Sequence, residues 1–370
     1  MNTAISLLGH TDFSRTNMIV YLGVSIEELQ QLPAAEMEEL LSEIGRSSRR
    51  GYHLYVLRRS IAKFASEQEC LGDLHRSEFK RLQADATQNF SLLSSAIKYI
   101  EIEIGDQLKT VPERKKWVIG HKKVLESELL SKSKLILEDA HSDGEVYRMF
   151  LDKGTAVGRG FKIQFEAHHG GGNQTFRRLR EQVAAGSVSV CICDHDMYAP
   201  NSARSDTFNK AKAESEKRDF IGKFFTPPFR ELENLIPLRV LRDFYPLVSP
   251  VRLDVLEQGI QAQGDVLQGD CLWLYFDVKE GVTGELLLKK CPGEKSQEWL
   301  RSKYLYGATT RLEEVSFPGF GDSVINTILN SGPALKELHS FLRSTYWKKH
   351  LHPFFEEVAW YLVGERRARL

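Results

Sequence analysis

Two short acidic clusters in the middle of the sequence have the residue types that metal-assisted chemistry needs. Glu138 follows the apolar run 134–137, and Asp194 and Asp196 follow a second apolar run, 187–193. Carboxylates that converge on one site repel each other unless a cation neutralises them, and such oxygen ligands suit Mg²⁺ or Mn²⁺. Ions held in this way orient a phosphate group and stabilise its attacking and leaving oxygens. The alternative is structural, because Asp-x-Asp after a strand is also common in turns and caps.

The sequence around these clusters predicts elements that bring the acids together. The expected strands and helices alternate: strands at 134–138, 161–165 and 187–193, and helices at 145–151 and 175–184. This alternation within about 60 residues indicates a parallel sheet. In open sheets of this kind the ligand site lies at the carboxyl ends of the strands, where both acidic clusters fall. The expected fold class is therefore α/β.

Four motifs in this region resemble those of the Toprim family, in the same order and with similar spacing. They are Leu135-Ile-Leu-Glu138 with Ser142-Asp143, the turn Gly170-Gly-Gly-Asn173, the run 188–196, and Arg230-Glu-Leu-Glu233-Asn-Leu-Ile-Pro237. In that family the first motif is a strand that ends in the catalytic Glu, and the third carries the Asp-x-Asp pair. The resemblance covers roughly residues 132–240, about a third of the chain. One departure is Asp139, where the family usually has Gly; it can serve as an extra ligand or as the turn residue.

The resemblance implies a nuclease that uses Mg²⁺, or Mn²⁺, to hydrolyse phosphodiester bonds in DNA or RNA, tRNA included. Glu138, Asp194 and Asp196 would be catalytic and bind metal, and Glu233, with Glu231 as the second choice, would complete a second metal site. The similarity is to nucleases of the OLD (overcoming lysogenisation defect) family and related phage-defence proteins, which implies an antiviral effector. No Gly-x-x-x-x-Gly-Lys-[Ser/Thr] loop is present, so an ATPase partner would be a separate chain.

Basic residues next to this core are candidates for contacts with nucleic acid. Arg177, Arg178 and Arg180 lie on the predicted helix that starts at the proposed site, which favours contacts with the phosphate backbone. His195 lies between the two aspartates and could contact a phosphate, although a solvent-facing histidine in a turn is an equally good interpretation. Basic clusters elsewhere are most simply solvated surface.

Other interpretations of the motifs give different functions. Asp194-His-Asp196 also fits the first motif of haloacid-dehalogenase-like phosphatases, where the first Asp is a nucleophile, but Tyr198 replaces a usually small residue. A Toprim-like fold could instead be a non-catalytic binding module that regulates a partner ATPase. The run His168-His-Gly-Gly-Gly resembles the oxyanion turn of some esterases, but the chain has no Gly-x-Ser-x-Gly elbow, so a serine hydrolase is excluded.

A further charged motif lies near the C-terminus. Asp277-Val-Lys279 follows an apolar run and resembles the Asp-x-Lys half of a restriction-type nuclease. A strand that ends in a charged turn explains the same pattern more simply. Lys279 could still approach the main acidic site from the C-terminal region.

The chain is expected to contain three regions: a helical N-terminal region over 1–130, a Toprim-like catalytic core over 131–245, and a mixed α+β region over 246–370. The elements expected in the outer regions are helices at 34–44 (ended by Gly45), 52–64, 90–104 and 324–361, and strands within 270–290. Near the end of 90–104, β-branched residues also allow a strand.

Composition limits the class of protein further. The 370 residues include 50 basic and 50 acidic ones, so nucleic-acid binding would depend on a local patch. The five cysteines form no Cys-x-x-Cys pair, which indicates reduced thiols, and Cys191 and Cys193 are expected on one face of a buried strand. No run is long and apolar enough to cross a membrane, so a cytoplasmic location is expected.

Overall fold

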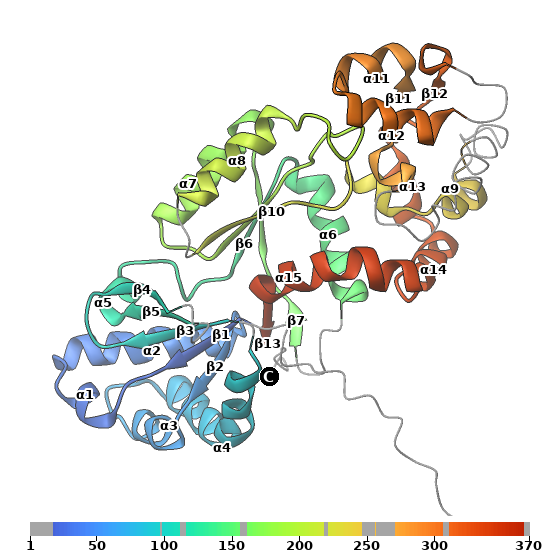
Figure 1. Cartoon of the computed structure of the whole chain (residues 1–370). Coiled ribbons are helices and arrows are strands. Elements are labelled where there is room, and N and C mark those ends of the chain that lie inside the picture. The colour runs from blue at the N-terminus through green and yellow to red at the C-terminus, as the bar shows by residue number, and fades with distance from the viewer. Residues whose placement is uncertain are drawn as a thin grey trace, which may run out of the picture.

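The computed structural model describes residues 18–96, 98–111, 116–155, 161–217, 221–245, 256, 271–305 and 311–365. These residues form an α/β protein with a five-stranded and a four-stranded sheet, each flanked by helices (Figure 1). The α/β class expected from the sequence is therefore confirmed. None of the described helices is both long and apolar enough to span a membrane.

The four-stranded central sheet has the strand order β10-β9-β6-β8, and its three pairings are parallel. Its strands are β6 (Lys134–Leu137), β8 (Glu166–His169), β9 (Ser189–Ile192) and β10 (Gly222–Phe225). The connecting helices are α6 (Ala140–Gly154), α7 (Thr175–Ala184) and α8 (Asp206–Glu216). Parallel strands need such crossovers, because each new strand starts at the same end of the sheet. The predicted strands 134–138 and 187–193 and helix 175–184 are confirmed.

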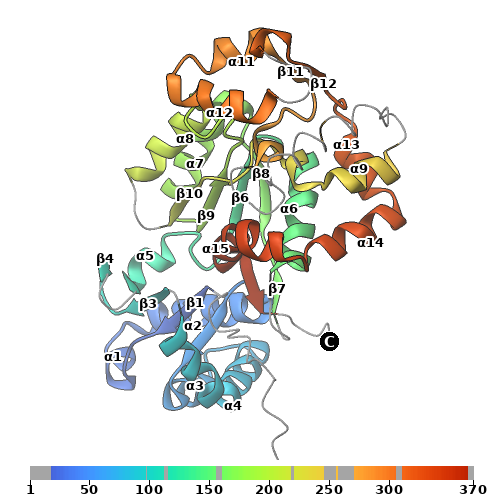
Figure 2. The ribbon, with the colours of Figure 1, turned by 45° about the vertical axis from the view of Figure 1, so that its right-hand side comes forward.

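Helices cover both faces of this sheet, as its buried strands require. On one face, Cys191 and Cys193 share an apolar cluster with Leu179 of α7 and Phe208 of α8. The expectation that both cysteines lie on one face of a buried strand is therefore confirmed. The other face is covered by α6 and α15 (His352–Leu362), and Figure 2 shows α6 opposite α7 and α8 across the strands.

A second α/β unit, 18–125, surrounds the five-stranded sheet, whose order is β2-β1-β3-β5-β4. Its strands are β1 (Ile19–Leu22), β2 (Leu54–Leu57), β3 (Tyr99–Glu103), β4 (Leu108–Val111) and β5 (Lys116–Gly120). Its helices are α1 (Ile26–Gln30), α2 (Ala34–Arg50), α3 (Arg59–Ser66), α4 (Asp73–Ser95) and α5 (His121–Leu125). All pairings in this sheet are parallel except that of β4 with β5. The unit lies at the amino ends of the central strands (Figure 1), where His53 Nε2 is 2.8 Å from the Ser131 carbonyl oxygen.

The prediction of a helical N-terminal region misses this sheet. Strands β1 and β2 are buried along their whole length, so they lack the alternation of apolar and polar residues that marks a surface strand. The predicted helix 52–64 is β2 followed by α3, and 90–104 holds the end of α4 and then β3. Helix α2 continues past Gly45, which packs against His75, and ends at Arg50; the capping residue Gly51 has a left-handed φ of 68°.

The strand predicted at 161–165 does not belong to the central sheet. β7 (Phe161–Ile163) pairs antiparallel with β13 (Val363–Glu365), near the end of the described chain. The central sheet uses β8 instead, so His168 and His169 end a strand and the turn begins after them. β8 has the sequence Glu-Ala-His-His and is only partly buried, so it lacks the apolar run that predicts a sheet strand, whereas the apolar residues of β7 resemble one.

The described part of the chain after β10 is helical for most of its length. Its elements are η4 (Leu232–Leu235), α9 (Leu238–Phe244), η6 (Leu272–Tyr275), β11 (Gly281–Thr283), α11 (Gly284–Lys290), α12 (Glu294–Tyr304), η7 (Leu312–Glu314), β12 (Ser316–Pro318), α13 (Val324–Leu329), α14 (Gly332–Phe341), η8 (Trp347–Leu351) and α15. The helical prediction for 324–361 is confirmed, whereas the strand-rich prediction for 270–290 is wrong. Among the described residues of that stretch only β11 is a strand. The apolar run that predicted a strand is instead one turn of 3-10 helix, η6, in which Leu272 and Leu274 are both buried.

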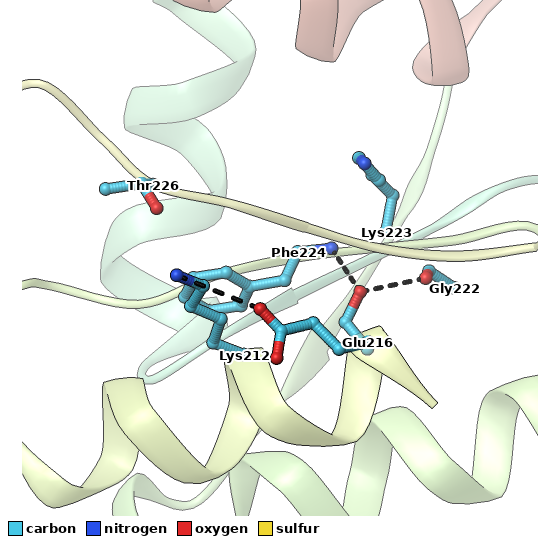
Figure 3. Close-up of a pocket in the computed structure, with 7 residues that line it drawn as sticks. Lys212, Glu216, Gly222, Lys223, Phe224 and Thr226 are labelled. Atoms are coloured by element: carbon cyan, nitrogen blue, oxygen red, sulfur yellow. Dashed lines mark hydrogen bonds and ion pairs between the residues drawn. The ribbon is translucent and has the colours of Figure 1, made fainter. Parts of the chain in front are cut away.

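The outer edge of the central sheet is covered by the protein's own helix. β10 is an edge strand, and the Ser215 hydroxyl of α8 donates to the Gly222 carbonyl (3.1 Å) and accepts from the Phe224 N–H (2.9 Å). These bonds lie beside a hollow of about 180 Å³ that Lys212 and Glu216 also line (Figure 3). An edge strand normally offers its backbone groups to another strand. Here two of those groups already have a partner within the chain.

Candidate active site

Glu138 and Asp194 lie at the carboxyl ends of two neighbouring strands of the central sheet. Glu138 follows β6 directly, and Asp194 comes just after β9, with Ile136 opposite Cys191 in the pairing of the two strands. β8 lies on one side of β6 whereas β9 and β10 lie on the other, so the chain changes direction between β6 and β9. Ligands of open α/β sheets bind in the crevice at such a point. The fold thus brings the two acidic clusters to one crevice.

Burial and mutual repulsion make negative charge unfavourable in this crevice. Burial and the charge of Asp196 raise the pKa of Glu138 to about 7, although the Asp194 N–H favours its charged form. Burial, followed by the charges of Glu138 and Asp143, raises the pKa of Asp194 well above its usual value. Burial also raises the pKa of Asp143, in the first turn of α6. These carboxyl groups therefore need positive charge nearby to be ionised together.

Two further glutamates reach the crevice from η4 and the residue before it. Glu233 is 4% exposed, and its Oε2 is buried with no hydrogen-bond partner in the described part of the chain. Glu231 instead uses Oε1 to accept hydrogen bonds from the N–H groups of Val278 and Lys279. Glu233 therefore has an oxygen available for a ligand, whereas Glu231 fastens the C-terminal segment to the crevice.

The positive charge in this crevice comes from Lys279, in the turn between η6 and β11. Its Nζ lies 3.2 Å from Glu233 Oε1. Its charge opposes the rise in pKa of five buried or half-buried carboxyl groups, namely Glu138, Asp143, Asp194, Glu231 and Glu233. Burial works against the charge of Lys279, but the carboxylates outweigh it and raise the pKa of the lysine. The expectation that Lys279 approaches the main site from the C-terminal region is confirmed.

A second ion pair, between Arg230 and Asp277, holds this C-terminal segment against the sheet. Both side chains are buried, and Arg230 Nη2 lies 2.7 Å from Asp277 Oδ2. Arg230 also lies over the Tyr198 ring, 3.9 Å from its centre, and donates from Nη1 to the Asp196 carbonyl (2.6 Å). Asp196 has a φ of 55°, the only positive φ outside glycine among the described residues. Arg230 therefore stabilises the unusual bend that positions Asp196.

His195 is placed differently from either interpretation of the sequence. It is only 3% exposed, and its Nδ1 accepts a hydrogen bond from the Met197 N–H (3.0 Å). Its ring packs on Tyr275, with 5.7 Å between the ring centres. Burial and the charge of Arg230 lower the pKa of His195 to about 3, so the imidazole is neutral at ordinary pH. A buried, neutral ring has no charge to offer a phosphate, so the predicted contact of His195 with nucleic acid is not supported.

The three arginines of α7 have different surroundings. Arg180 forms a two-pronged ion pair with Glu214 of α8, at 3.0 and 2.7 Å. Arg178 pairs with Glu181 one turn along the helix (3.1 Å), and Arg177 is exposed. Arg180 therefore joins two helices, and Arg177 and Arg178 are better placed to meet a ligand. Their contact with nucleic acid stays a prediction.

Asp139 is the turn residue, and Asp143 is the acid that reaches the crevice. The Asp139 carboxylate is exposed and accepts from the His141 N–H (2.9 Å), which caps the start of α6. Asp143 lies one turn further, because α6 begins at Ala140, shortly after Glu138. The position of Asp143 could have been predicted from the sequence, since the first turn of a helix that follows a strand lies at the same edge of the sheet as the end of that strand.

The donor set suits a hard divalent cation, although its side chains do not form a finished ligand cage. Among the described residues no three His, Cys, Asp or Glu side chains are grouped closely enough to hold one metal ion. Glu138 Oε1 and Glu233 Oε2 are both buried without a hydrogen-bond partner in that part of the chain. Buried oxygens in this state are unfavourable unless a ligand reaches them. Glu138, Asp194 and Glu233 therefore fit Mg²⁺ or Mn²⁺ by ligand type.

Comparison with protein-family models, curated proteins and solved structures finds no match for this chain. Its chemistry is therefore inferred from its own fold and crevice. The features that carry this inference are the half-buried acids at the ends of β6 and β9 and the lysine that faces them.

Without metal, the protein is expected to lose stability as the pH rises from about 5 to 8. Folding raises the pKa of Glu138 and Glu231 from 4.5 to about 7, and burial also raises the pKa of Asp194, Asp143 and Glu233. Between the unfolded and folded pKa values the native state binds more protons, so the free energy of unfolding falls as the pH rises. Thermal denaturation in EDTA measures this slope.

The variant Glu138→Gln shows how much of the slope belongs to the crevice. It removes one of the groups that titrate in this range, so its melting temperature should fall less steeply with pH than that of the wild type. Mg²⁺ should restore stability at pH 8 in the wild type. A slope identical in both proteins would contradict the raised pKa of Glu138.

Proposed function

We propose that this chain is a Toprim-like nuclease that uses Mg²⁺ or Mn²⁺ to hydrolyse phosphodiester bonds in DNA or RNA. The observation that supports this most is the convergence of Glu138 and Asp194 at the carboxyl ends of neighbouring parallel strands. Half-buried carboxylates whose pKa is raised by burial and by neighbouring acids need a cation to become ionised together. Phosphodiesters are a substrate class whose attacking and leaving oxygens such a cation site stabilises.

Each residue of the crevice would have a separate role in the proposed reaction. Glu138, Asp194 and Glu233 would hold the metal, and Asp196 would add a ligand from the partly exposed rim. When bound, the metal would activate water and neutralise charge on the phosphate oxygens. Lys279, fixed 3.2 Å from Glu233, offers a positive charge that can orient a phosphate oxygen.

The alternatives fit the surroundings of the crevice less well. A haloacid-dehalogenase-like phosphatase usually has a small residue at position 198, where the buried Tyr198 hydroxyl donates to Asp277 (3.2 Å). The run Gly321-Asp-Ser-Val-Ile-Asn326 resembles the late acidic motif of that family only weakly, and its Asp322 is exposed. Asp277 forms an ion pair with Arg230 and is not available as a metal ligand. Of the restriction-type Asp-x-Lys motif, only Lys279 can therefore take part in the site. A role in phage defence, with a separate ATPase partner, stays a prediction from the family resemblance.

A cleavage assay tests the proposal. The purified chain would be incubated with plasmid, single-stranded DNA and tRNA in Mg²⁺, Mn²⁺ or EDTA. Cleavage that requires metal is expected, and the polymer cut fastest identifies the substrate. Hydrolysis of p-nitrophenyl phosphate without cleavage of any polymer would overturn the nuclease proposal in favour of a phosphatase. Absence of both activities, with no Mn²⁺ binding by calorimetry, would favour a binding module that regulates a partner.

Lys279→Met is expected to lower the maximal cleavage rate by about a hundredfold. The substitution removes the charge that acts on the buried carboxylates and would meet the phosphate. Because the crevice then becomes more negative, the Mg²⁺ concentration that gives half-maximal rate should fall. Titrations of rate against Mg²⁺ measure both quantities. Lys289→Met, at an exposed position of α11, is the control, and equal rates in the two variants would contradict this role.

A further inference from the structure

The N-terminal unit contains a hollow that is separate from the acidic crevice. It is an open, shallow hollow of about 500 Å³. Its walls are Leu57 at the end of β2, Arg58 and Arg59 at the start of α3, and residues 86, 87, 90 and 91 of α4. β2 pairs in parallel with β1, so the hollow lies at the carboxyl edge of a second sheet. Ligand sites of α/β proteins are common at this edge.

Two arginines give this hollow its charge. Arg58 Nε donates to the Tyr21 hydroxyl (3.1 Å), which fixes the plane of the guanidinium. Arg58 and Arg59 are both exposed, and neither has an ion-pair partner among the described residues. None of the residues that line the hollow is acidic. Guanidinium groups without a carboxylate partner favour an anion, and their planar shape suits the paired oxygens of a phosphate.

An aromatic ring completes the hollow. Phe90 is 45% exposed, although a phenylalanine ring gains free energy from burial. The Tyr21 ring contacts the Phe90 ring edge-on, with 5.8 Å between the ring centres. Tyr21 in turn packs on Tyr99, at 6.4 Å between the ring centres. The ring is therefore held in place while much of its surface stays open. Nucleic-acid-binding proteins use fixed, exposed rings of this kind to stack on a base.

We propose that this hollow binds a nucleotide unit, with the base stacked on Phe90 and the phosphate held by Arg58 and Arg59. The Phe90 ring would stack on a flat, apolar part of the ligand, and the two guanidinium groups would bind an anionic part. A nucleotide carries both. The unit can come from a free nucleotide or from a single strand of nucleic acid. This inference goes beyond the proposed catalytic function and does not depend on it.

Binding measured in EDTA tests the inference apart from any cleavage. The probes are AMP, a short single-stranded oligonucleotide, inorganic phosphate and adenosine, titrated by calorimetry. The wild type should bind AMP or the oligonucleotide more tightly than phosphate or adenosine. Arg59→Glu and Phe90→Ala should each weaken that binding by about tenfold or more. Lys80→Glu, which reverses an exposed charge on the same helix α4, should leave the affinity unchanged.

The pattern of binding separates the two sources of the ligand. If the wild type binds AMP and both Arg59→Glu and Phe90→Ala lose this binding, the ligand is a free nucleotide. If the wild type binds only the oligonucleotide and both variants lose this binding, the ligand is a single strand of nucleic acid. Phosphate that binds as tightly as AMP, with no effect of Phe90→Ala, would overturn the nucleotide assignment. So would absence of binding of every probe, or equal affinities of the Arg59→Glu and Lys80→Glu variants.

Discussion

Asp194→Asn should lower metal-dependent cleavage by about a thousandfold or more and should raise the melting temperature of the metal-free protein. The substitution keeps the shape of the side chain but removes a ligand oxygen charge. Burial and the charges of Glu138 and Asp143 make ionised Asp194 unfavourable in the folded state. Removing that charge therefore relieves repulsion while it removes the means of binding a cation. Cleavage rates and thermal denaturation in EDTA measure the two effects.

Asp139→Asn is the matched control for this prediction. Asp139 follows Glu138 in the chain, but its carboxylate is exposed and caps α6, and asparagine caps a helix equally well. Rate and stability should both stay close to those of the wild type. If Asp194→Asn retained full cleavage, the metal centre would lie elsewhere. If it lost cleavage together with stability, the loss would report a damaged fold instead of missing chemistry.

Asp277→Ala is expected to reduce the free energy of unfolding by about 3 to 5 kcal/mol. Arg230 and Asp277 are 6% and 5% exposed, with 2.7 Å between their charged atoms. Without the carboxylate, the buried guanidinium has no counter-charge at that position, and the Tyr198 hydroxyl and Glu280 N–H lose an acceptor. Urea denaturation measures the change. Cleavage should also fall, because the segment that carries Lys279 loses its anchor.

Two further variants show whether the loss comes from an uncompensated charge. The double variant Arg230→Met with Asp277→Leu replaces both charges by apolar groups and should recover a large part of the stability. Arg178→Ala breaks the exposed pair with Glu181 and should cost less than about 1 kcal/mol. A double variant as unstable as Asp277→Ala alone would show that shape, and not charge, determines the loss.

Two strands of the central sheet and one of its helices could be predicted because their signals are local. The strands that end in Glu138 and Asp194, and the helix 175–184, follow from short apolar runs and one amphipathic stretch. The N-terminal sheet could not be predicted in the same way, since the four-residue β2 lies directly before α3 and β3 lies shortly after α4, so that each strand merges with a helix into one apolar stretch. A buried run of this length fits a strand and a helix equally well.

The convergence of Glu138 and Asp194 could be predicted because both follow strands of one parallel sheet, whereas the contacts that bring Lys279 to them could not. Glu138 and Asp143 are joined by one strand end and one helix turn, but Lys279 reaches them from a segment far along the chain. Its approach depends on buried contacts between Arg230 and Asp277, and no spacing in the sequence records such a pairing. His195 shows the converse, because a polar motif residue became a buried ring once Tyr275 packed on it.

The serine that bridges α8 and β10 affects how copies of this protein meet when they are crowded. An exposed strand edge is where one molecule can extend the sheet of another and begin a growing aggregate. Ser215 occupies two of the groups such a neighbour would need, and Phe208 of the same helix packs on Phe224, with 4.8 Å between the ring centres. A second chain could pair along β10 only after α8 had separated from this strand. Self-association by this route is therefore tied to partial unfolding, and a mutation that loosens α8 would affect solubility before it affected the crevice.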